Sequence, residues 1–275
     1  AGAGDVAHLL ELRFDTELST PRPGQGGDAF EALREFYVAR DFRPLWTGPS
    51  GPGAAARTFS RTLDTADADG LYPADYGAPI IARGLADESA AGQADLELNL
   101  SGALIRYGGE LSAGRVDPAR VDSELYVYPS AVPAAELLAA AADGAVDIGE
   151  YLAALAPQSK EYRRLKGALA DYRRIAAAGG WGMVPAGKTL KPGMRDPRIA
   201  LLRRRLEASG DIAITAPDPE HYGKPLEAAV RHFQYRHGLD VDGAVGKNSL
   251  AALNVPIAAR IEQILLNMER RRWMP

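Results

Sequence analysis

Apolar side chains recur at helical spacing through most of the first two thirds of the chain. The longest stripe returns every three or four positions along residues 96–111, as one face of an amphipathic helix requires. It consists of Leu96, Leu100, Ala103, Leu104, Tyr107 and Leu111. Shorter helical patterns, rich in alanine, cover residues 54–68, 134–145, 148–157 and 160–180. Strand-type alternation is scarce, so residues 1–190 are predicted to form one mainly helical domain.

Three short apolar stripes follow a Pro/Gly-rich linker at residues 187–197. Asp196 is a candidate N-cap, and Pro197 suits the first helical position. The stripes are Ile199, Leu202 and Leu206; Leu226, Ala229, Val230 and Phe233; and Leu250 and Leu253. Helices of this length are marginal alone in water. We therefore expect them to share one core, as a small three-helix domain over residues 191–256.

The stretch "GLDVDGAVG" at residues 238–246 combines glycines with apolar residues. Gly238 is expected to end the second short helix in a left-handed conformation, because it has no Cβ to clash. The Asp242-Gly243 pair is expected to reverse the chain. Leu239, Val241 and Val245 are expected to fill the space between the second and third helices.

A fourth helix is predicted after Pro256. Its stripe is Ile257, Ile261, Ile264, Leu265 and Met268. Three arginines, 270–272, follow where the helix dipole favours cations. An apolar stripe needs a partner surface, so residues 257–275 are expected to return to the domain of residues 1–190. The predicted fold class is therefore mainly α, a helical scaffold domain with a small three-helix domain.

Composition removes several kinds of chemistry. The 275 residues include no cysteine, which excludes disulfides, zinc ribbons and cysteine nucleophiles. The chain has no G-x-S-x-G or H-E-x-x-H motif. His232 and His237 are five positions apart, about 140° around a helix, so they do not face one metal ion. We expect no cofactor and no metal. No stretch of about 18 apolar residues predicts a membrane span, and no signal peptide is visible.

Charge is unevenly distributed. Residues 191–275 hold 14 Lys and Arg against 10 Asp and Glu, while the whole chain holds 32 against 36. A mildly basic end suits an anionic polymer, either nucleic acid or cell wall, although it is more often simply a solvated surface. The arginines at 203–205 and 270–272 point several ways on their helices, and no platform of aromatic and basic residues appears. Nucleic acid is therefore not expected as a partner.

The motifs of the last third resemble a known domain. They are Phe233-Gln234, Gly238-Leu239, Asp242-Gly243, Val245-Gly246 and Leu253, with Ser249 where threonine is usual. Their spacing is similar to that of the small peptidoglycan-binding domain found in many bacterial wall enzymes. The resemblance implies peptidoglycan as the partner. Candidate ligand contacts are Tyr222, Arg231, Gln234, Tyr235 and Asp242. Arg231 would pair with a stem-peptide carboxylate, and the two tyrosines would pack on sugar or peptide.

The remaining sequence resembles the non-catalytic part of a large periplasmic L,D-transpeptidase. The resemblance rests on "FYVARDFRPLW", "LDTADADGLYP", "LSAGRVDP" and "ILLNMERRRWMP". In that family a catalytic domain with a cysteine nucleophile follows, and it crosslinks stem peptides between adjacent diaminopimelate residues. The chain stops before such a domain and has no cysteine, so we expect it to be non-catalytic. The resemblance also implies the periplasm of a Gram-negative envelope, with the missing catalytic domain and other wall-synthesis proteins as further partners.

Two alternative functions stay open. The chain could be a stand-alone wall hydrolase that uses carboxylates, since 36 acidic residues are available. Release of soluble muropeptides by the chain alone would identify it. The chain could also be a protein-interaction scaffold without wall affinity, which would fail to pellet with any wall preparation.

Overall fold

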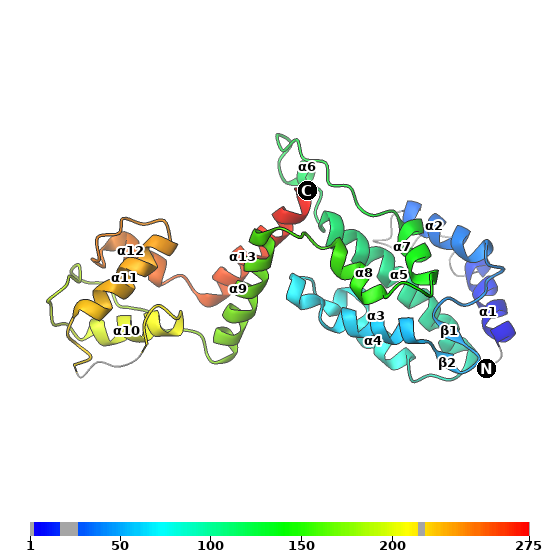
Figure 1. Ribbon diagram of the computed structural model, residues 1–275, viewed down its shortest axis with the longest axis horizontal. Helices are drawn as coiled ribbons and strands as arrows, with labels where there is room; N and C mark the ends of the chain where they lie inside the picture. Colours follow the sequence, from blue (N-terminus) through cyan, green and yellow to red (C-terminus); the bar gives the residue numbers. More distant parts are fainter. Residues whose placement is uncertain (1–2, 17–26, 214–217, 275) are drawn as a thin grey trace. The chain divides into compact units, whose positions relative to one another are not determined.

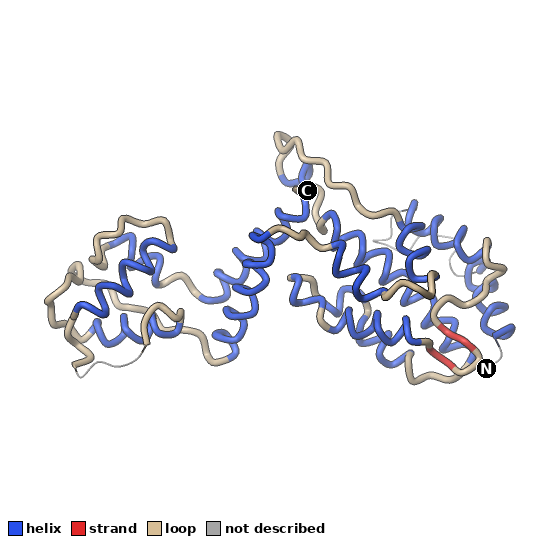
Figure 2. Tube along the Cα trace, viewed as in Figure 1, coloured by secondary structure: helices blue, strands red, loops and turns tan. Residues whose placement is uncertain are grey.

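Helices dominate the computed structural model, which describes residues 3–16, 27–213 and 218–274 (Figure 1). The predicted mainly α fold is confirmed. In these residues the strands are two antiparallel segments of two residues each, β1 (Thr47–Gly48) and β2 (Gly51–Pro52), coloured red in Figure 2. The chain divides into two compact units, residues 1–166 with 266–275, and residues 167–265. The predicted boundaries at 190 and 256 were drawn from sequence pattern and stay a prediction.

The first unit contains eight α-helices and two 3-10 helices entirely within its described residues. They are α1 (Ala3–Thr16), α2 (Gly27–Val38), α3 (Ala54–Asp64), η1 (Ala66–Asp69), η2 (Pro73–Tyr76), α4 (Ala78–Gly84), α5 (Ala90–Ala113), α6 (Pro118–Val121), α7 (Ala134–Ala142) and α8 (Ile148–Leu155). The second unit contains α10 (Arg198–Ala208), α11 (Lys224–Arg236) and α12 (Lys247–Leu253). Two helices, α9 (Lys160–Ala177) and α13 (Ile257–Trp273), have residues in both units.

Helix α5 is the centre of the first unit. It packs against α1, α2, α4, α7 and α8 (Figure 1). The predicted stripe along residues 96–111 is confirmed, since none of its side chains is more than 7% exposed. Ser89 caps the helix by accepting the Gly92 N–H at 3.0 Å. At Gly108 a Cβ would lie 2.6 Å from the end of the Leu137 side chain on α7, so a larger residue there would force Leu137 to move.

A buried carboxylate on α5 ties the segment after α2 to the core. Glu97 is fully buried, and its oxygens accept the backbone N–H groups of Leu45, Trp46 and Thr47 at 2.6–2.8 Å. The Tyr37 hydroxyl donates to it at 2.8 Å. Burial raises the pKa of Glu97, and these hydrogen bonds oppose the rise. A chain segment without regular helix is thereby held by one side chain.

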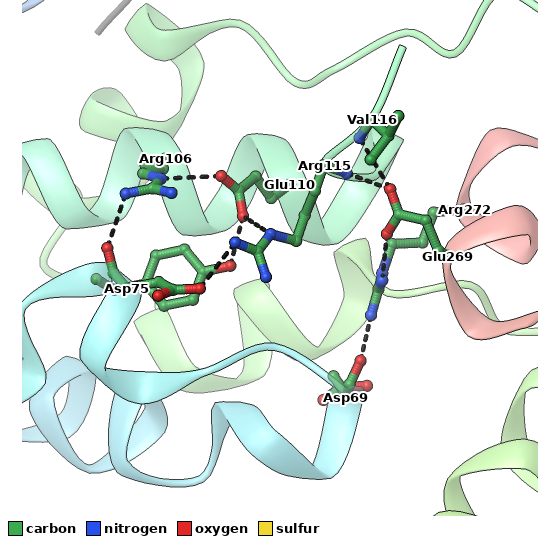
Figure 3. A network of polar contacts seen from close by, with 9 residues as sticks. Asp69, Asp75, Arg106, Glu110, Arg115, Val116, Glu269 and Arg272 are labelled. Atoms are coloured by element: carbon green, nitrogen blue, oxygen red, sulfur yellow. Dashed lines mark hydrogen bonds and ion pairs between the residues drawn. The ribbon is translucent and has the colours of Figure 1, made fainter. Parts of the chain in front are cut away.

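The last two turns of α13 pack on the first unit. Met268 is fully buried there. Glu269 accepts the backbone N–H groups of Arg115, at 2.5 Å, and of Val116, at 3.0 Å, just beyond the end of α5 (Figure 3). The predicted apolar stripe of α13 is therefore divided. Its first four residues, from Ile257 to Leu265, are half-buried in the second unit, and Met268 belongs to the first.

Arg272 adds a second anchor for the same turns. It is 5% exposed and donates to the Asp69 carbonyl and to Glu269, the latter at 2.9 Å (Figure 3). It also donates to the Tyr162 hydroxyl at 2.9 Å. The Asp69 carboxylate pairs with Lys166 at 2.8 Å. This buried arginine is therefore hydrogen-bonded to acceptors on three segments of the unit, and Glu269 supplies its paired negative charge.

In the second unit, α10, α11 and α12 share one core, as predicted. Every residue of their three stripes is buried except Leu250, which packs against the core from a half-buried position. Val184, Leu190, Tyr222 and Val245 complete the core. Leu190 and Val245 exchange two backbone hydrogen bonds, of 2.9 and 3.2 Å, and so join the linker to the turn before α12.

Two details of this unit differ from the sequence prediction. Helix α10 begins at Arg198, after Pro197, although Asp196 still accepts the Arg198 N–H at 2.9 Å as an N-cap does. The expectation that Val241 fills the core is wrong. Its side chain is 44% exposed, because the turn faces outward there, and Leu239 and Val245 supply the apolar contacts.

Candidate functional site

Gln234 organises the turn between α11 and α12. It lies on the inner face of α11 and is 1% exposed. Its carboxamide nitrogen donates to Asp242 at 2.8 Å and to the Ala244 carbonyl at 2.9 Å, and it lies 3.1 Å from the Ser249 hydroxyl. Its carboxamide oxygen accepts the Gly243 N–H at 2.9 Å. One buried side chain therefore provides the hydrogen bonds that the backbone groups of this turn would otherwise find in regular secondary structure.

Tyr222 supports the same turn from the core. It is 1% exposed, and its hydroxyl donates to the Gly243 carbonyl at 2.8 Å. Burial raises the pKa of this hydroxyl, which therefore stays protonated. Gly238 and Gly243 have φ angles of 63° and 73°, which confirms the predicted left-handed Gly238. A Cβ at Gly243 would also lie 3.1 Å from both Arg231 and Glu227.

Five residues on the outer side of α11 and of this turn form a surface, here called the Arg231 face, on which only Glu227 is half-buried. They are Glu227, Arg231, Tyr235, Val241 and Asp242. The Arg231 guanidinium donates to the Val241 carbonyl at 2.6 Å and to Glu227 at 3.2 Å, while the side chain stays 45% exposed. Tyr235 follows Arg231 by four positions on α11, so both point from the same side of the helix. Its side chain is 75% exposed.

The Arg231 face offers several kinds of contact side by side. The Ala244 N–H, and then Gln234, lower the pKa of Asp242, so this carboxylate is charged at neutral pH. Arg231 suits a ligand carboxylate, and Asp242 suits an amine. The Tyr235 ring and the Val241 side chain offer apolar area for a sugar or peptide. The face can bind an amphoteric ligand, and nothing in it forms a nucleophile with a base.

The structure separates the five predicted contact residues into two groups. Tyr222 and Gln234 are buried and hold the turn, so any effect they have on a ligand is indirect, through the turn backbone or through the Asp242 side chain that Gln234 binds. The other three lie together on the Arg231 face. Their contact with a ligand stays a prediction. Glu227 and Val241 were not among the predicted contacts. The four-residue spacing from Glu227 to Arg231 on a predicted helix indicates that the two side chains pair, so Glu227 could have been found from the sequence. Val241 could not, because its apolar side chain predicts a core position.

In residues 3–16, 27–213 and 218–274, no three His, Cys, Asp or Glu side chains are arranged to hold a metal ion. His232 contacts Asp211 at 2.8 Å, and His237 contacts the Phe233 carbonyl at 2.8 Å. Within the same ranges no single helix is long and apolar enough to cross a membrane. The pair α12 and α13 passes that test only together, with a bend of 83° between them.

Two family models match the chain. Residues 195–253, which include the whole Arg231 face, match a model described as a peptidoglycan binding domain. The chain thus carries a peptidoglycan-binding domain, which supports wall binding and a wall-associated location. Residues 31–169 match a model described as "Scaffold domain". No curated protein matches the chain. Because the second match covers half of its 275 residues, the chain belongs to the Scaffold domain family.

Proposed function

We propose that the Arg231 face is the surface with which this chain binds peptidoglycan, and that the chain is the wall-binding and scaffolding part of a periplasmic L,D-transpeptidase. One observation carries the first half of the proposal. The residues that match the peptidoglycan-binding model include an exposed arginine, an exposed tyrosine and a charged aspartate on one side of α11 and its turn.

The chemistry of the face suits this polymer. Peptidoglycan offers carboxylates and amines on its stem peptides and apolar faces on its sugars. Arg231 would pair with a carboxylate, and Tyr235 would pack on sugar or peptide. Glu227 and the Val241 carbonyl hold the guanidinium in place, which lowers the entropy cost of binding. A single site of this size is weak, and the repeated ligand raises retention through effective concentration.

The transpeptidase part of the proposal rests on the resemblance of the helical segments and junctions to that family. The role of this chain would be non-catalytic, because the family uses a cysteine thiolate as nucleophile and the chain contains no cysteine. The helical unit would then support a catalytic domain, and the small domain would keep it at the wall.

Pelleting with purified, insoluble peptidoglycan tests the binding surface. The wild-type chain is expected to sediment with the polymer. The pair Arg231→Ala and Tyr235→Ala is expected to weaken retention by roughly tenfold or more, because a charge-assisted hydrogen bond and an aromatic contact are lost. The matched control is the pair Arg57→Ala and Tyr126→Ala, which removes an exposed arginine and a tyrosine that is 80% exposed from the helical unit.

Equal recovery of the wild type and the Arg231/Tyr235 variant would reject this surface. Failure of the wild type to sediment, with specific capture of a partner protein, would favour an interaction scaffold without wall affinity. Soluble muropeptides released by the chain alone would reject the non-catalytic role and favour a hydrolase.

A further inference from the structure

The helical unit contains a pocket that none of the preceding arguments uses. Its volume is about 700 Å³, within the range of roughly 300–1,000 Å³ that small-ligand sites occupy. It lies against α5, between α2 and the segment that contains η2. We call it the α5 pocket. All of its lining residues belong to the first compact unit.

One wall of the α5 pocket is apolar, and the α5 side has space for a ligand. Phe30 and Leu33 on α2 contribute the apolar wall, and both are largely buried. Gly102 and Gly109 lie on the α5 side. A Cβ built at Gly109 meets no atom within 4 Å, so the space beside this helix position is open. An aliphatic group of a ligand therefore has both a surface to contact and the room to enter.

The polar end of the pocket carries both signs of charge (Figure 3). Arg106 donates to Glu110 at 2.9 Å and to the Asp75 carbonyl at 2.8 Å, and its side chain is 46% exposed. Glu110 also accepts the Tyr76 hydroxyl at 2.6 Å and pairs with Arg115 at 3.2 Å. Glu110 is thus fully engaged, and it fixes the position of the Arg106 guanidinium.

Three polar groups of this pocket keep atoms for a ligand. Within the described residues, the hydrogen bonds of Arg106 use Nε and Nη1 and leave Nη2. Arg115 binds Oδ2 of Asp75 at 2.7 Å and leaves Oδ1. The carboxamide of Asn99, which also lines the pocket, makes no hydrogen bond to the described part of the chain. Asp75, Asn99 and Arg106, the residues that carry these atoms, all line the pocket.

We propose that the α5 pocket binds a short peptide that carries both a carboxylate and an amine. The carboxylate pairs with Arg106, the amine pairs with Asp75, and a peptide bond pairs with Asn99, whose amide both donates and accepts. An aliphatic side chain packs on Phe30 and Leu33. The chemistry is that of peptidoglycan stem peptides with diaminopimelate, so the identity of the peptide rests on the proposed function. The site itself is separate from the Arg231 face.

Calorimetric titration of the full chain with a soluble stem tetrapeptide containing diaminopimelate tests this site. The wild type is expected to bind it. Gly109→Leu places a side chain in the open space and is expected to weaken binding at least tenfold. Gly167→Leu is the matched control, since Gly167 also lies within a helix with no atom near its Cβ and does not line the pocket. Leucine favours helix over glycine at both positions, so both variants are expected to fold.

A second comparison identifies the charge contact. Arg106→Gln is expected to weaken the tetrapeptide severalfold and to leave a tetrapeptide with amidated carboxylates unchanged. Equal weakening of both peptides, or unchanged affinity in Gly109→Leu, overturns the proposal. So does a wild type that does not bind the tetrapeptide, whatever its retention on the insoluble wall. Equal wall retention of the wild type and Arg231→Ala/Tyr235→Ala, with intact titration, rejects the proposed function of the Arg231 face and leaves the pocket standing, because neither Arg231 nor Tyr235 lines the pocket.

Discussion

The carboxamide nitrogen of Gln234 lies 2.8 Å from the carboxylate of Asp242, so a buried residue is bonded directly to an exposed one. The same carboxamide accepts the Gly243 N–H and donates to the Ala244 carbonyl. The position of Asp242 on the Arg231 face is therefore set from inside the domain. A mutation at a buried position such as Gln234 is therefore expected to change the conformation of the Arg231 face.

Replacing Gln234 with methionine keeps the size of the side chain and removes its hydrogen bonds. The Gly243 N–H and the Ala244 carbonyl then lose a buried partner, which should cost about 2–4 kcal/mol of unfolding free energy. Chemical denaturation measures the loss. Asn248→Met on α12, where the side chain is exposed, is the control and should change stability little. A Gln234 variant as stable as this control would refute the role assigned to the carboxamide.

Glu97→Gln tests the buried carboxylate on α5. Each oxygen of Glu97 accepts at least two donors, and an amide nitrogen cannot accept any of them. The variant should lose about 2–4 kcal/mol of unfolding free energy, and the amides of residues 45–47 should exchange faster with solvent. Glu161→Gln, at an exposed position of α9, is the matched control. Unchanged exchange at residues 45–47 would show that these bonds do not hold the segment.

His237 should make the second unit sensitive to acid. Burial lowers the pKa of its ring below 6.5, while the ring lies 3.9 Å from Phe233 and contacts the Phe233 carbonyl. The unfolded chain therefore takes up a proton at a higher pH than the folded one. The stability due to the neutral ring is present above pH 6.5 and is lost as pH falls through the folded pKa.

Two measurements check this pH dependence. An NMR titration should place the His237 pKa below its ordinary value. The unfolding free energy of the wild type should fall more steeply on acidification below pH 6.5 than that of His237→Gln, which has no ring to titrate. Parallel slopes for the two proteins would contradict the assignment.

Glu269→Ala should loosen the last two turns of α13. The variant removes the acceptor for the Arg115 and Val116 amides and one partner of the buried Arg272 (Figure 3). A loss of about 1–3 kcal/mol of unfolding free energy is expected, mainly because the buried Arg272 guanidinium loses its charged acceptor. Hydrogen exchange should rise at Arg115, Val116 and Met268. Glu262→Ala, exposed on the same helix, is the control. Equal exchange in the two variants would rule out this anchor.

Periodicity was sufficient to predict the helices whose burial depends on one stripe. The α5 stripe and the shared core of α10, α11 and α12 were both found this way, because apolar residues at three- and four-residue spacing have one stable orientation. Glu97 was not found. Its type suggests a solvent position, and its burial depends on donors about fifty residues away, at Leu45 to Thr47. Such a contact leaves no periodic signal.

The predicted contact residues show the same limit. Gln234 and Tyr222 are predicted as ligand contacts because they are polar residues that flank the second short helix and its turn, yet both are buried and bond to the turn around Gly243. Val241 was assigned to the core because it is apolar, and the turn exposes it. Residue type predicts burial only as a tendency. At Gln234, Tyr222 and Val241, the geometry of the turn before α12 decides burial instead.

The turn before α12 is held from the core side by Gln234 and Tyr222, so its exposed residues contribute little to the stability of the fold. Tyr235 and Val241 can therefore be replaced without loss of the fold, because the backbone beneath them is held by buried residues. A library randomised at these two positions should consist mainly of folded proteins that differ in the ligands they bind. The small domain is, in this sense, a natural starting point for evolving new carbohydrate and peptide specificities.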